Sequence, residues 1–174
     1  MRLLFALLAA AFCASTAQAE DVESVRNLQI AVNGTIGQRC AIGSIGNVDF
    51  GNLDRRGLGV DARVALDCNI PFAMTIIGQS GALTHTQMPQ GQGPYSGSLP
   101  YSLGVTVPVR HPSSEIVSRT FASRDLRSGG LVLSNGGIAT DGMTLSILLS
   151  DPPGEAGLLA GDYSETITIT VSSI

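Results

Sequence analysis

The stretch "GDYSETITITVSSI", Gly161 to Ile174, alternates between aliphatic and small polar residues. Ile167, Ile169 and Val171 share one parity, and threonine fills the positions between them. A period of two residues is typical of a β-strand with one buried face. This segment therefore predicts a C-terminal strand, which Tyr163 begins on the same parity as the three aliphatic residues.

Seven further segments that precede it are also expected to form strands. They cover residues 46–53, 59–68, 71–81, 99–109, 119–123, 130–134 and 142–150. A helix could also explain "SSEIVSRTFASRDL" (113–126), which we assign to strand and loop, and the Gly- and Pro-rich stretch 85–98 is expected to be a long loop. Short strands at this spacing, in a chain with 21 glycines and 8 prolines, indicate an all-β, antiparallel sandwich.

The N-terminus has the features of a secretory signal peptide. Arg2 precedes an apolar run over residues 3–14, and an A-x-A cleavage site ends at Ala19. The run is too short to cross a bilayer. We therefore expect cleavage between Ala19 and Glu20, export, and no membrane span after the signal is removed. The mature chain then consists of an N-terminal extension over residues 20–36 and one domain over residues 37–174.

Export determines how the cysteines are interpreted. Cys13 leaves with the signal peptide, so that Cys40 and Cys68 remain. In an oxidising compartment an even pair is most simply a disulfide, and closing a loop of this length contributes roughly 3 to 4 kcal/mol in the chain-entropy model. A metal site with these two ligands is the alternative, but no histidine lies near either cysteine in the sequence.

Charge and motifs exclude several classes of function. The sequence contains no lysine, and without Arg2 it has 9 arginines against 14 acidic residues, a formal charge of 9 − 14 = −5. Nucleic acid is therefore not an expected partner. The two histidines, His85 and His111, lie in polar surroundings, and no metalloprotease, hydrolase or nucleotide-binding motif is present. We expect neither enzymatic activity nor a cofactor or metal.

A second alternating stretch, "NLQIAVNGTIGQRC" (27–40), lies at the start of the mature chain. It places on one parity four aliphatic residues and a glycine: Leu28, Ile30, Val32, Gly34 and Ile36. Such a strand could enter the core of another molecule. Because Asn33-Gly34 stands between two alternating runs, a local hairpin is the other interpretation.

Four pieces of the sequence, in order, resemble the spore coat protein U domain family, which includes subunits of archaic chaperone-usher pili. They are "CAIGSIGNVDFG", the cysteine of "ALDCN", "LPYSLG" and the closing "GDYSETITITV". The resemblance covers essentially the whole mature chain, although residues 84–97 and 110–128 have no counterpart in it.

This resemblance implies an incomplete immunoglobulin-like sandwich that lacks its last strand. A periplasmic chaperone lends a strand, an outer-membrane usher assembles the fibre, and the N-terminal extension of the next subunit, a copy or a related pilin, then fills the gap. The five residues on the shared parity of 28–36 would form that donor strand, and Tyr163, Ile167, Ile169 and Val171 would form one edge of the acceptor groove. Without lysine, linkage through lysine side chains is excluded, so assembly would be noncovalent.

The resemblance also implies passage through the periplasm to a fibre on the cell surface. A rival interpretation is a self-contained secreted β-sandwich that serves as a coat or carbohydrate-binding protein. Such a protein needs no donor extension, and deletion of residues 20–36 would leave it a folded monomer.

Overall fold

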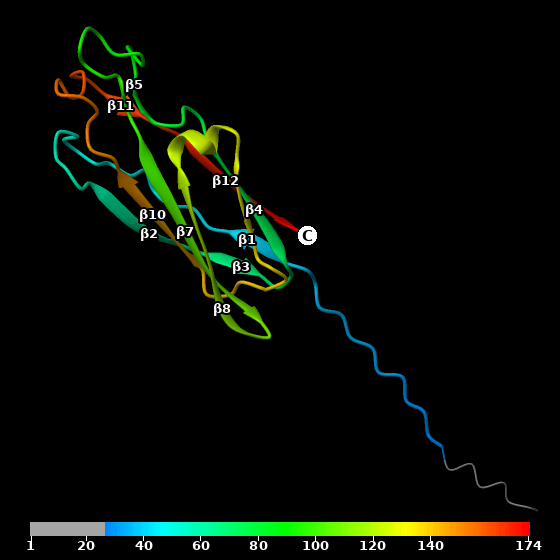
Figure 1. The fold of residues 1–174 in the computed structure, drawn as a ribbon. Coiled ribbons are helices and arrows are strands. Elements are labelled where there is room, and N and C mark those ends of the chain that lie inside the picture. The colour runs from blue at the N-terminus through cyan, green and yellow to red at the C-terminus, as the bar shows by residue number, and fades with distance from the viewer. Residues whose placement is uncertain (1–26) are drawn as a thin grey trace, which may run out of the picture. The chain divides into compact units, whose positions relative to one another are not determined.

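The computed structural model describes residues 27–174 and divides the chain into two units, one ending at Thr35 and the other spanning Ile36–Ile174. The predicted signal peptide and its cleavage site at Ala19 and Glu20 lie outside the described residues. In the first unit, residues 27–35 form neither helix nor strand. All regular secondary structure described below belongs to the second unit (Figure 1).

Two antiparallel sheets form the body of the second unit. One has the order β2 (Gly59–Val64), β10 (Met143–Leu149), β7 (Tyr101–His111) and β8 (Ser113–Ala122), and the other has the order β12 (Ile167–Ser173), β4 (Phe72–Gly78) and β9 (Gly130–Leu133). Their inner faces supply one hydrophobic core. The prediction of an all-β, antiparallel sandwich is confirmed.

Smaller elements close parts of this sandwich. β1 (Cys40–Ile42) pairs with β3 (Leu66–Cys68), and β5 (Leu83–His85) pairs with both β6 (Ser98–Leu99) and β11 (Tyr163–Ser164). A short 3-10 helix, η1 (Ser123–Arg127), connects β8 to β9.

Alternation along the central strands explains where the core lies. In β7, alternate residues from Tyr101 to Val109 are buried, and in β4 the same holds for Phe72, Met74 and Ile76. Successive side chains of a strand point to opposite faces, so each of these strands supplies one apolar row to the space between the sheets. The central strands are thus fully covered on their inner face.

The prediction of a strand over residues 46–53 is wrong. No main-chain hydrogen bond joins residues 44–53 to a strand of the described chain. The burial pattern nevertheless alternates, because Val48 and Phe50 are half-buried while Asn47 and Asp49 are exposed. The segment has the side-chain pattern of a strand without a pairing partner.

The C-terminal strand is also not continuous, contrary to the prediction from residues 161–174. Glu165 and Thr166 separate β11 from β12, so that Tyr163 pairs with His85, whereas Ile167 begins the pairing with β4. The Glu165 carboxylate explains the break, since it accepts main-chain N–H bonds from Ser80 (3.0 Å), Ala82 (3.1 Å) and Thr166 (2.8 Å).

Two further predictions need correction. Residues 113–126 form one long strand, β8, followed by η1, so the strand expected over 119–123 is longer than predicted. The stretch 85–98 is not entirely loop, because β5 includes His85 and β6 begins at Ser98. β8 forms a hairpin with β7, the strand just before it, whereas His85 of β5 pairs with Tyr163, which is distant in sequence.

Candidate functional site

The two lateral sides of the sandwich differ in how well they cover the core. On one side η1 spans from β8 to β9 and places Leu126, which is fully buried, in the core. On the other side lie the edges of β2 and β12, each of which pairs with only one strand. This second side is the candidate functional site.

Inner-face residues on the second side are only half-buried. Ile167, Ile169 and Val171 of β12 lie in register with Gly78, Ile76 and Met74 of β4, which are all buried and share their face. On the opposite sheet Val60 and Ala62 of β2 and Ile147 of β10 are likewise half-buried. Inner-face side chains at these two edges are therefore less buried than those of the central strands.

A groove with a volume of about 530 Å³ opens on this side, and two of these residues, Ile147 and Ile167, line it. One wall is the unpaired segment, which contributes Ile45, Val48 and Phe50, and the other walls come from β10 and from the stretch between Tyr163 and Ile167. Tyr101 and Leu83 also line it. The edge of β12 presents unpaired main-chain N–H and C=O groups, so an extended chain with apolar side chains on one parity would suit this site.

The groove has a polar end. Glu165 lies there, with its carboxylate held by the three main-chain N–H groups described above. The hydroxyl of Tyr101, a residue with 3% exposure, has no hydrogen-bond partner within residues 27–174. Burial, and secondarily the negative charge of Glu165, raise the pKa of Tyr101 well above its ordinary value, so its hydroxyl is a neutral donor at physiological pH.

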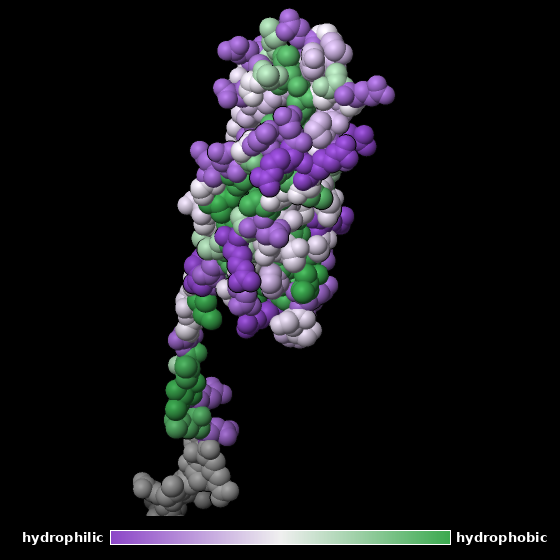
Figure 2. Space-filling model, turned by 90° about the vertical axis from the view of Figure 1, so that its left-hand side faces the viewer, coloured by the Kyte–Doolittle hydropathy of each residue, from purple (hydrophilic) through white to green (hydrophobic). Residues whose placement is uncertain are grey.

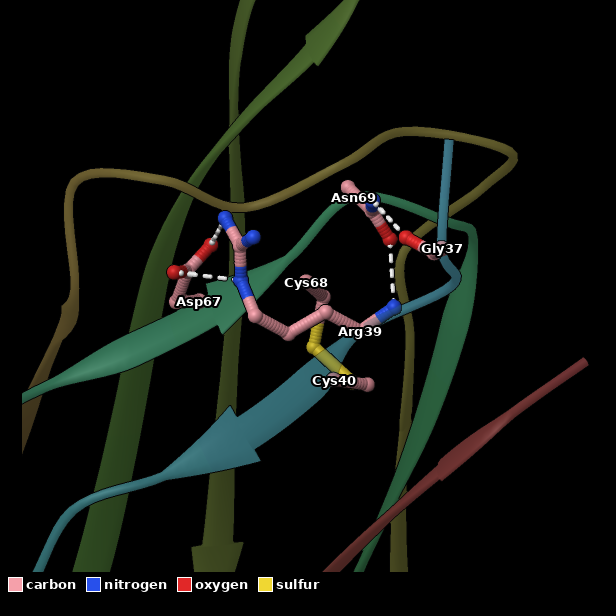
Figure 3. A network of polar contacts seen from close by, with 6 residues as sticks. All are labelled: Gly37, Arg39, Cys40, Asp67, Cys68 and Asn69. Atoms are coloured by element: carbon pink, nitrogen blue, oxygen red, sulfur yellow. Dashed lines mark hydrogen bonds and ion pairs between the residues drawn. A yellow bond between two sulfur atoms is a disulfide. The ribbon is translucent and has the colours of Figure 1, made fainter. Parts of the chain in front are cut away.

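A disulfide fixes the place where the chain enters the body (Figure 3). Cys40, the first residue of β1, is bonded to Cys68, the last residue of β3, as predicted. Beside it, Arg39 makes two hydrogen bonds of 2.8 and 3.0 Å to the Asp67 carboxylate, which raise the pKa of Arg39, and Asn69 accepts a bond from the Arg39 N–H (2.7 Å). The ion pair is exposed and adds little stability, so we regard the disulfide as the main link that holds β1 to β3 at this point.

The N-terminal segment contains a row of exposed apolar side chains. The exposed fractions are 85% for Leu28, 73% for Ile30, 88% for Val32 and 87% for Ile36, and Gly34 has no atom within 4 Å of the position of a Cβ. In Figure 2 the segment is green along much of its length. The alternative hairpin is absent, since residues 27–39 form no strand and Asn33 does not have the positive φ that its turn requires.

The structure therefore brings some predicted site residues together and separates others. Ile167, Ile169 and Val171 lie on one inner face as expected, whereas Tyr163 belongs to β11 and lines the groove from beyond the break. The polar end at Tyr101 and Glu165 was not predicted. Its signal in the sequence is weak, because Glu165 continues the parity of the aliphatic residues and only its polarity marks it out.

The sequence analysis placed His85 in a loop, whereas it is a buried residue at the end of β5. It is 6% exposed, its Nδ1 accepts N–H bonds from Gln87 (3.1 Å) and Met88 (3.0 Å), and its Nε2 lies 3.1 Å from the Ala160 carbonyl oxygen. The ring also packs edge-on against Tyr163. Since Nδ1 accepts, the proton is on Nε2, and all polar atoms of the ring serve local structure.

Within residues 27–174 no three His, Cys, Asp or Glu side chains are arranged to hold a metal ion. The same part of the chain contains no helix long and apolar enough to cross a membrane. Comparison with known proteins adds no further identification, since neither a protein-family model nor a curated protein sequence matches the chain.

Proposed function

We propose that this protein is a structural subunit of a chaperone-usher-type pilus or surface fibre, which polymerises noncovalently by donor-strand complementation. The observation that carries the proposal is a complementary pair within one chain. The body has an apolar groove beside the unpaired edge of β12, and the N-terminal segment has an exposed row of aliphatic residues on one parity. In a fibre, the segment of one copy would occupy the groove of the next.

The chemistry of the two surfaces supports this pairing. Strand addition joins main-chain groups at a sheet edge and places alternate side chains in pockets. Leu28, Ile30, Val32 and Ile36 contribute about 1.5 to 3 kcal/mol each when buried, or about 6 to 12 kcal/mol as an upper bound before ordering costs. The alternating but unpaired residues Val48 and Phe50 would offer the incoming strand a second wall.

The proposed partners follow from the sequence resemblance to the spore coat protein U domain family. A periplasmic chaperone would shield the groove in transit, an outer-membrane usher would assemble the subunits, and the fibre would lie at the cell surface. The disulfide between Cys40 and Cys68 is consistent with an oxidising compartment on this route.

The proposal is tested with a charge placed on the donor parity. We expect Ile30→Asp or Val32→Asp to abolish fibre formation, because a carboxylate in an apolar pocket is costly unless it is paired. The matched control is Ala31→Asp, which adds the same charge on the opposite parity. Fibre yield and recovery of the subunit with its chaperone are measured together, and chaperone recovery should be equal in all variants because residues 30–32 are exposed.

Normal fibres from both Ile30→Asp and Val32→Asp subunits would contradict the proposal. A folded, functional monomer after deletion of residues 20–36 would favour the rival, a self-contained secreted coat or carbohydrate-binding sandwich.

A further inference from the structure

The strand β8 (Ser113–Ala122) forms a long open edge on the side of the sandwich away from the groove. It is the outer strand of the four-stranded sheet and pairs with β7 alone. Proteins commonly keep edge strands short, because an open edge can pair with another chain. η1 begins only where β8 ends, and every residue of 113–120 except Val117 is exposed. The strand therefore offers ten residues of main chain to another molecule.

Two hydrogen bonds determine which main-chain groups of β8 face outward. In β7, the N–H of Arg110 donates to Ile138 (2.9 Å) and not to β8, whereas the N–H of Tyr101 donates to Ser123 (3.2 Å), the residue that follows β8. Bonding groups alternate in direction along a strand, so the odd-numbered residues of β7 bond to β8. Their partners in β8 are Glu115, Val117, Arg119 and Phe121. Within residues 27–174 nothing pairs with the remaining main-chain groups, which belong to Ser114, Ile116, Ser118 and Thr120.

The charged side chains of β8 have opposite signs and flank a central valine. Glu115 and Arg119 each lie two residues from Val117, and both are exposed. Neither forms an ion pair within the described chain. A charge on an edge strand ordinarily hinders pairing, because like charges directly opposite each other repel. With one charge of each sign, an alignment exists in which a second copy brings opposite charges together.

That alignment is antiparallel pairing of β8 with β8 of a second copy, centred on Val117. Val117 then faces Val117 of the second copy, and Glu115 faces Arg119 of the second copy twice by two-fold symmetry. A centre at Glu115 or Arg119 would place that charge opposite its own copy. A centre at Ile116 or Ser118 would place one charge opposite Val117. The register centred on Val117 is therefore the one in which both charges are paired.

The main chain suits the same register. Ile116 lies opposite Ser118 of the second copy, so the groups that face outward meet as hydrogen-bonded pairs. Val117 and the charged residues then form the other kind of pair, in which the side chains lie closer together. Ile116, which is 68% exposed, becomes a diagonal neighbour of its own copy, close enough for long side chains to make contact.

We propose that the free edge of β8 is a second self-association surface, at which two copies of this chain pair antiparallel around Val117 and join their four-stranded sheets into one. The partner is a second copy because the charges of the strand complement themselves across a two-fold axis. The surface is independent of the donor segment, since the groove lies on the other side of the sandwich. In the fibre of the proposed function the contact would repeat along the length, and many weak contacts would hold two fibres side by side.

The test uses the full chain with Ile30→Asp and Val32→Asp, so that the donor segment cannot join copies. Sedimentation velocity over a range of protein concentrations gives the dissociation constant of the pair. We expect Glu115→Arg, and separately Arg119→Glu, to weaken self-association at least about fivefold, because two symmetry-related attractions become repulsions. Added salt should weaken association of the parent chain, since exposed charges are screened.

Charge complementation is the matched control. Each single variant repels itself, but an equimolar mixture of Glu115→Arg and Arg119→Glu chains should associate as the parent does, because every new charge then faces its opposite. The chain that carries both substitutions should also pair with itself. A variant that had merely lost stability would be rescued by neither arrangement.

A cysteine at the centre measures the register. In a non-hydrogen-bonded antiparallel pair the two Cα atoms lie about 4.5 Å apart, within the range of a disulfide. Val117→Cys should therefore link two copies under mild oxidation. Ser118→Cys is at a more exposed position but faces Ile116 of the second copy, so it should link more slowly.

Three results would overturn the pairing of β8. They are a parent chain that stays monomeric at about 1 mM, single variants that associate as the parent does, and a mixture that restores nothing. Glu115 and Arg119 would then be charges that protect an open edge. Because the donor segment is already disabled in every chain used, such a failure leaves the proposed function standing, and fibre yield tests that function separately.

Discussion

Tyr101 and Tyr163 carry the same hydroxyl group but differ in whether it has a hydrogen-bond partner. The Tyr163 hydroxyl has two carbonyl oxygens within hydrogen-bond distance, whereas the Tyr101 hydroxyl is buried without a partner. The Tyr163 hydroxyl donates to the carbonyl of nearby Leu159 or to that of Ser96, 67 positions away, whereas Gly78 lies beside the Tyr101 hydroxyl. The same side chain thus has a satisfied hydroxyl at one position and a buried hydroxyl without a partner within residues 27–174 at the other.

Tyr101 should make the stability of the protein sensitive to alkaline pH. Burial, followed by the charge of Glu165, raises the pKa of Tyr101 above its ordinary value of 10.0. Between pH 10 and the raised pKa of the folded state, the Tyr101 hydroxyl keeps its proton in the folded state and has lost it in the unfolded state. The contribution to stability is therefore fully present below pH 10 and is lost as pH rises above it, at up to about 1.4 kcal/mol per pH unit.

Urea unfolding between pH 9 and 11.5 measures this effect in the acceptor variant, which is the full chain with Ile30→Asp and Val32→Asp so that its own segment cannot fill a neighbouring groove. Tyr101→Phe should make the decline in unfolding free energy with pH shallower, because the substituted residue does not ionise. Tyr163, whose pKa is also raised by burial, contributes in the same direction in both proteins and cancels in the comparison. Identical slopes would show that Tyr101 ionises equally in the folded and unfolded states.

The disulfide and the burial of His85 differ in how far the sequence could predict them. The disulfide followed from the expectation that the chain is exported and that two of its three cysteines remain after signal cleavage, and it is present. The burial of His85 could not be predicted in the same way, because one of its partners is the carbonyl of Ala160, 75 residues away. Its shared parity with Leu83 was the one local signal.

At the scale of the elements, alternation predicted which residues face inward better than it predicted which residues pair. Ile167, Ile169 and Val171 share the inner face of β12, as expected. Residues 46–53 have the same kind of pattern but no strand beside them, so they form none. The break before β12 depends on Glu165 and the turn at Ser80, a contact that spans 85 positions.

β12 offers adjacent positions that separate the groove from the outer face. Ile169 lies on the inner face opposite Ile76, whereas Thr170 is exposed and lies opposite Thr75. We expect Ile169→Asp to lower the unfolding free energy of the acceptor variant by about 2 to 4 kcal/mol and to prevent peptide binding, because it places a charge against the core. Thr170→Asp should cost less than about 1 kcal/mol.

Urea unfolding and calorimetry with the peptide of residues 25–38 provide both measurements. Retained binding in the Ile169→Asp variant, or equal loss of binding in the Thr170→Asp variant, would mean that the inner face of β12 is not a wall of the binding site.

At the scale of the whole molecule, the sandwich is covered unequally on its two sides. The central strands β4 and β7 are fully buried on their inner faces, the side closed by η1 is well packed, and the side between β2 and β12 has half-buried aliphatic residues. The disulfide offsets part of this deficit by about 3 to 4 kcal/mol in the chain-entropy model. An apolar sheet edge without cover is also a site of aggregation.

The unoccupied protein should therefore be marginally stable, and a strand that binds only the folded state should stabilise it by mass action. At a free peptide concentration of 100 times Kd the gain is about 2.7 kcal/mol, which corresponds to a rise in melting temperature of about 5 to 11 °C for a chain of this size. The acceptor variant is heated with increasing amounts of the peptide of residues 25–38, and its melting temperature should rise with the logarithm of peptide concentration.

The control peptide has aspartate in place of Ile30 and Val32 and should leave the melting temperature unchanged, because its charges cannot be buried against Ile167 and Ile169. This comparison separates groove filling from nonspecific stabilisation, since the two peptides share their length and the remaining twelve residues. A monomeric acceptor variant that is already thermally robust, and whose melting temperature responds to neither peptide, would show that the open side needs no complement. The half-buried aliphatic residues of β2 and β12 would then be ordinary edge-strand residues of a self-contained sandwich.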